Sequence, residues 1–145
     1  MDNKFMDIAY RQCLKAYKNQ DVPVGAVIVK DGKVISKAYN KKHKKNCALY
    51  HAEMIAIKKA CKKIKDYRLI NCDVYVTKEP CLMCMGALLS SRVNAIYFGA
   101  FDKKYGVVDK IDQFCFNHTC IIKGGIQEEK CAKVLSEFFK NLRSK

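Results

Sequence analysis

Apolar side chains recur at helical spacing in three parts of the chain. Between residues 3 and 19 they return every three or four positions, with polar residues between them. The same spacing follows His51 and recurs over residues 128–142. We therefore predict three amphipathic helices. On the second, the side opposite the apolar stripe is basic and should be a solvated face: Lys58, Lys59, Lys62 and Lys63.

β-branched and aromatic residues cluster in shorter runs that predict strands. Residues 22–39 hold two such runs joined at Asp31-Gly32, which is the pattern of a tight β-hairpin. Residues 72–77, 94–99 and 118–123 predict three more strands. The polar segment 40–47 reads as a basic loop. Residues 81–91 are apolar nearly all round, which predicts a buried helix.

The order of these elements predicts the fold class. A hairpin followed by alternating helices and strands indicates an α/β fold of three layers, α/β/α, with a mixed sheet covered by helices on both faces. The 145 residues, half of them hydrophobic, suit a single domain over 1–145. No stretch reaches the length of a membrane span, and the start of the chain lacks a signal-peptide pattern, so we expect a cytoplasmic protein without membrane contact.

The charge balance is strongly basic. Lys and Arg total 28 against 14 acidic residues, a formal net charge of +14. Such a surface favours polyanions through counterion release, so nucleic acid is one interpretation. The other is compositional drift, because most of the basic residues are Lys rather than the bidentate phosphate reader Arg.

Nine cysteines could suggest a disulfide scaffold, but such scaffolds are short, secreted and loop-rich. An odd count in a chain of this kind favours free thiols, most of them packed in the core or at the surface. The pair Cys81 and Cys84 is different, because C-x-x-C spacing is also typical of a redox dithiol or of half a zinc site. Pro80 before it suits the first helical position, which would place both thiols in the first turn of a helix.

His51 and Glu53 favour a zinc site over a redox dithiol for the Cys81/Cys84 pair. Side chains two positions apart on a helix diverge, so both can serve one site only if His51 lies at the helix entrance. H-x-E followed by P-C-x-x-C is the signature of zinc deaminases. In this interpretation His51, Cys81 and Cys84 hold one Zn²⁺ per subunit and leave its fourth position to a water. Zinc-bound hydroxide attacks the substrate, and Glu53 shuttles the proton. A closed structural site would need a fourth ligand such as His118 or Cys47.

The chain resembles the bacterial tRNA-specific adenosine deaminase family, within the cytidine deaminase-like zinc-dependent superfamily. The resemblance runs through "DVPVGAVIV" (21–29), "HAEM" (51–54), "VYVTKEPCLMCMGALL" (74–89) and "YFGAFDKKYG" (97–106). It implies a cytidine deaminase-like fold with a five-stranded sheet and a homodimer. It also implies hydrolysis of adenosine to inosine at the wobble position of a tRNA anticodon, with attack at C6 and release of ammonia.

The resemblance further implies a set of substrate-binding residues. Asn40 would hold the purine, main-chain groups around 77–80 would face the leaving amino group, and Asp102 would lie near the ribose and RNA backbone. An aromatic pair in the last helix would help to place the anticodon loop. The full set is Val24, Asn40, Ala52, Glu79, Pro80, Asp102, Phe138 and Phe139. For the two phenylalanines, core packing is the competing interpretation.

Two segments depart from the family pattern, both on the substrate side. Residues 47–50 read "CALY" where the family has Asp-Pro-Thr-Ala, and the stretch after Gly106 lacks a Gly-Ser segment and is shorter. Deamination of a free nucleobase or nucleoside, such as guanine or cytosine, is therefore an alternative. A zinc-stabilised RNA-binding protein without turnover is another.

Overall fold

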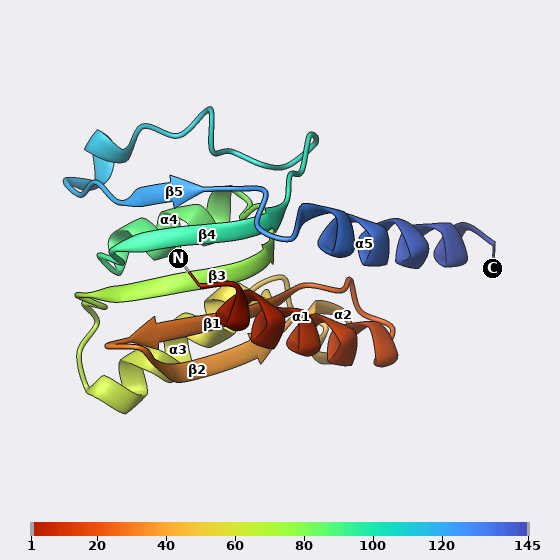
Figure 1. Ribbon diagram of the computed structural model, residues 1–145, viewed down its shortest axis with the longest axis horizontal. Coiled ribbons are helices and arrows are strands. Elements are labelled where there is room, and N and C mark those ends of the chain that lie inside the picture. The colour runs from red at the N-terminus through yellow and green to blue at the C-terminus, as the bar shows by residue number, and fades with distance from the viewer. Residues whose placement is uncertain (1, 145) are drawn as a thin grey trace.

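The first half of the sheet is built by the predicted hairpin. The computed structural model in Figure 1 describes residues 2–144, apart from the side chains of Phe114 and Cys115. Strands β1 (Gly25–Lys30) and β2 (Lys33–Tyr39) pair antiparallel, with a register shift between Ile28 and Val29. Asp31 and Gly32 have φ of 51° and 74°. Both lie in the left-handed region, as a two-residue turn that matches the strand twist requires.

The remaining strands complete a mixed sheet. β3 (Cys72–Lys78) pairs antiparallel with β1 and parallel with β4 (Ala95–Ala100), which pairs parallel with β5 (Ile121–Lys123). The order is β2-β1-β3-β4-β5. The predicted mixed five-stranded sheet is confirmed, although its last strand is only three residues long. A short 3₁₀ helix, η1 (Gln113–Phe116), precedes that strand.

Helices cover both faces of the sheet, which confirms the predicted three layers. α1 (Asn3–Lys18) and α5 (Glu128–Arg143) pack on one face. α3 (Ala52–Ile64) and α4 (Leu82–Ser90) pack on the other and lie behind the strands in Figure 1. Each face has its own apolar cluster, and the strands contribute alternate side chains to the two.

Two local predictions need correction. The segment 40–47 is not only a loop, because it contains the one-turn helix α2 (Lys42–Lys45). α4 is not buried all round, since Cys84, Met85, Leu88 and Leu89 face the core while Leu82 is 65% exposed. An apolar composition on every side of a helix cannot show which side packs against the sheet.

The lysines predicted for the outer side of α3 are exposed, as the pattern indicated. The eight cysteines whose side chains are described are free thiols, so no disulfide holds the described part of the fold. Within residues 2–144 no helix has both the length and the apolar character to cross a bilayer.

A close approach of α1 to β1 depends on Gly25. A Cβ atom at this position would fall 2.5 Å from the main-chain nitrogen of Cys13 and closer still to the carbonyl oxygen of Ala9. We predict that Gly25→Ala lowers the free energy of unfolding by about 3 kcal/mol, because the helix must move away from the sheet. Urea denaturation measures this change in the free energy of unfolding.

Gly86 in α4 provides the matched control. Its Cβ would meet only the Phe116 ring, at 3.7 Å, an ordinary contact. Gly86→Ala should therefore change stability by no more than about 1 kcal/mol, in the stabilising direction, through helix propensity. Equal losses for the two substitutions would show that the α1–β1 approach is not the constraint.

Candidate active site

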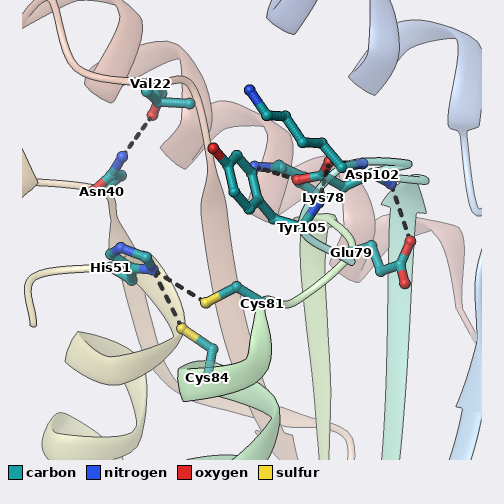
Figure 2. A network of polar contacts seen from close by, with 10 residues as sticks. Val22, Asn40, His51, Lys78, Glu79, Cys81, Cys84, Asp102 and Tyr105 are labelled. Carbon is teal, nitrogen blue, oxygen red and sulfur yellow. Dashed lines mark hydrogen bonds and ion pairs between the residues drawn. The ribbon is translucent and has the colours of Figure 1, made fainter. Parts of the chain in front are cut away.

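Two helices that are far apart in sequence begin next to each other at one end of the sheet. His51 is the N-cap of α3 and Cys81 the N-cap of α4. The His51 Nδ1 atom lies 3.7 Å from the Cys81 sulfur and 3.5 Å from the Cys84 sulfur. Figure 2 shows the ring and the two sulfurs converging between the helix ends. The three residues predicted as ligands are thus brought together.

The position of Pro80 corrects the sequence prediction. α4 begins at Leu82, so Pro80 precedes the cap and is not the first helical residue. Cys81 has the extended conformation of a cap, with φ −76° and ψ 177°, and its carbonyl accepts the Met85 N–H at 2.8 Å. Cys84 follows in the first turn. This arrangement still allows both sulfurs to face one point, since the cap residue and the third helical residue are neighbours.

The distances within the cluster fit a tetrahedral zinc site. Zinc bonds of about 2.05 Å to nitrogen and about 2.3 Å to sulfur, at a tetrahedral angle, separate the two ligand atoms by about 3.6 Å. The observed N···S distances of 3.7 and 3.5 Å agree with this. All three ligand atoms lie within 4.8 Å of one another. His51, Cys81 and Cys84 could therefore hold a zinc ion without rearrangement.

A fourth protein ligand is not part of this cluster in residues 2–144 as described. His118 instead donates from Nε2 to the Val93 carbonyl at 2.7 Å. Cys47 is half-buried in the segment before α3 and does not belong to the cluster. Three ligands are typical of catalytic zinc sites, which keep one position for water or substrate.

The protonation of the cluster also favours a cation. The hydrogen bond from the Cys84 thiol, and after it the His51 ring, lowers the pKa of Cys81 to about 3, although burial acts against this. The same interaction raises the pKa of Cys84, and the Cys81 sulfur raises the pKa of His51. The pKa values of the two thiols thus move in opposite directions, as expected for two sulfurs that share a proton, which a bound cation would replace.

Glu53 lies beside the cluster but outside the ligand set. Its side chain is 4% exposed and lines the cavity, and it interacts electrostatically with Cys81 and His51. Burial raises the pKa of this carboxyl. A carboxyl with a raised pKa next to a metal position is suited to accept and return a proton near neutral pH.

A cavity of about 710 Å³ opens above the cluster. Its walls come from the loops after α1, β2, β3 and β4 and from α5. Five residues of the predicted substrate set line it: Val24, Asn40, Ala52, Glu79 and Phe139. Three others do not line it: Pro80, Asp102 and Phe138. The prediction therefore named the right elements, but not always the side chain that faces the cavity.

Glu79 and Asp102 organise the wall that follows β4. The Glu79 carboxylate accepts the N–H groups of Asp102 at 3.0 Å and Val108 at 3.1 Å. The Asp102 carboxylate accepts the N–H groups of Lys104 and Tyr105 and pairs with Lys78 at 2.9 Å. Burial acts to raise the pKa of Asp102, but Lys78 and these amides outweigh it and hold the pKa below its ordinary value. Both carboxylates thus have partners within the chain, and the position of Asp102 near the ribose and RNA backbone stays a prediction.

The two phenylalanines of α5 have different surroundings, one buried in the core and one at the cavity. Phe138 is 9% exposed and packs edge-on against Tyr17, so it belongs to the core. Phe139 is 39% exposed and lines the cavity. Only Phe139 is available to a substrate.

Sequence reasoning missed several cavity residues. Tyr105 is 60% exposed and lines the cavity with Lys104, whose ammonium lies 5.2 Å from the Tyr105 ring centroid. Lys110 also lines it. The sequence signal that could have found them is an aromatic residue among lysines in "DKKYG". Of the two departing segments, the one after Gly106 reaches the cavity through Val107 and Lys110, whereas residues 47–50 do not line it.

Comparison with known proteins agrees with this geometry. Residues 1–100 match the cytidine and deoxycytidylate deaminase zinc-binding region, which makes the chain a zinc-dependent deaminase by family. A tRNA-specific adenosine deaminase of Bacillus subtilis (strain 168) is 40% identical over 99% of this chain and 92% of its own length. The chain belongs to the tRNA-specific adenosine deaminase family.

Solved structures extend the comparison. One from biochemical and structural studies of A-to-I editing by tRNA:A34 deaminases at the wobble position of transfer RNA superposes with a TM-score of 0.88. It is 35% identical, over 92% of this chain and all of that one. A guanine deaminase from Bacillus subtilis is 36% identical, over 70% of this chain and 66% of that one, with a TM-score of 0.66.

Zinc content tests the three ligands. We predict about one zinc per purified chain, and a loss of at least tenfold in zinc occupancy for Cys84→Ser and His51→Ala, because two ligands cannot retain the ion. Inductively coupled plasma mass spectrometry measures it. Cys120→Ser, a buried thiol outside the cluster, should keep full occupancy. Equal zinc in all variants would exclude this site.

Proposed function

We propose that this protein hydrolyses the wobble adenosine of a tRNA anticodon to inosine and releases ammonia. The observation that carries the proposal is the three-ligand cluster beside a buried glutamate at the base of an open cavity, in a chain of the tRNA-specific adenosine deaminase family. Structural similarity to a tRNA:A34 deaminase supports the same substrate.

His51, Cys81 and Cys84 would hold the zinc ion. When bound, zinc supplies the Lewis acidity that brings the pKa of a coordinated water down to about 7. Glu53 takes one proton of the attacking water and delivers it to the ring nitrogen N1, and it then carries the second proton, from the new C6 hydroxyl, to the amino group, which leaves as ammonia. Its burial excludes bulk water, which would otherwise compete for the proton.

The cavity walls would orient the base. The Asn40 side chain donates one N–H to the Val22 carbonyl at 3.2 Å, and its oxygen accepts the Lys42 N–H at 3.1 Å. These bonds fix its orientation and leave the second amide hydrogen for a purine acceptor. Val24 and Ala52 provide apolar walls for the ring. Glu79 acts indirectly, by holding the loop that carries Tyr105.

The rim of the cavity suits an RNA strand more than a free base. Lys42, Lys104 and Lys110 line it, and Tyr105 and Phe139 offer exposed aromatic faces. Cations for phosphates and aromatic rings for unstacked bases are the common elements of single-stranded RNA recognition. Guanine deamination remains the second candidate, because a guanine deaminase shares 36% identity with the matched part of this chain.

Incubation with anticodon stem-loop RNA tests the function. We expect inosine at the wobble position, detected by mass spectrometry of the digested RNA. Glu53→Gln should reduce the rate by about 10³-fold or more while zinc stays bound, because it removes only the proton carrier.

Two controls separate the alternatives. Ammonia release from free guanine, cytosine or adenosine without inosine in any adenosine-bearing anticodon loop would establish a free-base deaminase instead. Full RNA binding and full zinc content without any turnover would indicate a binding protein.

We further propose that the protein acts as a homodimer. Leu82 lines the cavity and is nevertheless 65% exposed, and Phe101 at the end of β4 is 55% exposed. Exposed large apolar side chains, one of them at the rim of the site, are typical of a protein–protein interface.

Sedimentation velocity tests the dimer. We expect a species of twice the chain mass at micromolar concentration, and a shift to monomer for Leu82→Glu, which would place a charge in the apolar contact. Tyr67→Glu, an equally exposed residue outside the cavity rim, is the control. A wild-type monomer at these concentrations would contradict the proposal.

A further inference from the structure

A second groove lies between α1 and the edge strand β2. It measures about 470 Å³. One wall is a single stripe of α1, and the other is β2 from Val34 to Lys37. The helix residues are spaced at i, i+3, i+4 and i+7, so they share one face: Ile8, Arg11, Gln12 and Lys15. In Figure 1, α1 lies in front of the sheet at this edge.

Gln12 lines this groove without a hydrogen-bond partner of its own. Its side chain is only 5% exposed, yet within residues 2–144 its amide makes no side-chain hydrogen bond. No buried side-chain polar atom of the described residues lacks a partner, so the Gln12 amide atoms are reached by solvent. The exposed remainder of the side chain faces the groove, where the amide is free to bond a molecule that enters it.

The charges around Gln12 indicate an anionic ligand. Arg11, Lys15 and Lys37 surround the groove, and in the described part of the chain none of them forms an ion pair. The acidic residue nearest to Arg11 in α1 is Asp7, which is already engaged by Lys130 at 3.3 Å and Gln127 at 2.8 Å. No acidic residue is among the groove's described lining residues.

The groove lies on a path from the active-site cavity. Lys37 of β2 lines the groove. Asn40, three residues further along the chain, lines the active-site cavity. At about 3.3 Å per residue, the two are about 10 Å apart along the strand. A nucleic-acid strand that leaves the cavity could reach the groove within two or three nucleotides.

We propose that this groove binds a phosphodiester of the RNA substrate outside the nucleotides in the cavity. The Gln12 amide donates to a phosphate or ribose oxygen, and Arg11, Lys15 and Lys37 neutralise the backbone charge. The proposal rests on the proposed function, because the ligand is that same RNA. The apolar side chains Ile8 and Val34 face the sugar.

RNA binding to the zinc-loaded Glu53→Gln protein tests the groove, because it separates binding from turnover. The probe is an anticodon stem-loop RNA, titrated at several salt concentrations. We expect Lys15→Gln/Lys37→Gln to raise Kd by about tenfold and to reduce the slope of log K against log salt by about 1.5, close to one per lost phosphate contact. Gln12→Leu should raise Kd several-fold.

The first control removes two lysine charges from another surface of the chain. Lys58→Gln/Lys62→Gln removes the same charge from the exposed side of α3 and should change Kd less than twofold. A trinucleotide RNA, with one nucleotide on each side of the base in the cavity, is too short to reach the groove and should bind all variants equally. Gln12→Leu should not lower stability in urea, because no internal hydrogen bond is lost.

Failure of the groove proposal can be told apart from failure of the proposed deaminase function. Equal Kd and equal salt slope for the groove and α3 variants overturn the groove proposal even if wild-type protein forms inosine. Reduced RNA binding in the groove variants supports it even if no inosine forms, which would overturn the proposed function instead. Loss of the dimer in Gln12→Leu would make the groove a contact between copies of the chain and would overturn RNA binding there.

Discussion

The site depends on two helix starts meeting at one end of the sheet. His51 ends the segment that leads from β2 into α3, and Cys81 ends the turn from β3 into α4. Because β2 and β3 both run antiparallel to β1, their C-terminal ends lie at the same end of the sheet, and the helices that follow them pack on the same face. The extended conformation of each cap turns its side chain toward the other helix. Metal ligands from segments 30 residues apart are thus held by the core rather than by the loops.

The carboxylates in the cavity wall have a different role from the Glu53 carboxylate beside the three metal ligands. Glu53 faces the cluster, where burial raises its pKa and prepares it for proton transfer. Glu79 and Asp102 accept main-chain N–H groups and close the loop after β4 around themselves. A Cβ at Gly106 would overlap the Glu79 carboxylate, so a larger residue there would displace this carboxylate from its hydrogen bonds. One wall of the cavity is therefore held by charge-assisted hydrogen bonds in addition to the apolar packing of Val107 and Val108.

The positions of the basic residues, rather than their number, indicate what these residues do. The lysines of α3 are solvated, and their number alone carries no function. Those at the cavity rim and in the α1–β2 groove lie beside aromatic rings or an unpartnered amide. This clustering supports the proposed RNA-binding surface over compositional drift, whereas the net charge of +14 alone does not distinguish the two.

The sequence determined the elements and the chemistry, because both are local properties. Apolar spacing predicted the helices, Asp31-Gly32 predicted the hairpin, and H-x-E with C-x-x-C predicted three ligands and a proton carrier. Only the tertiary structure decided which face of α4 is buried, that Pro80 precedes the helix, and that Phe139 rather than Phe138 faces the cavity. It also decided that Asp102 pairs with Lys78 and that the Gln12 amide has no hydrogen-bond partner among the described side chains. These are contacts between residues distant along the chain, and local pattern carries no information about which distant side chain will be the neighbour.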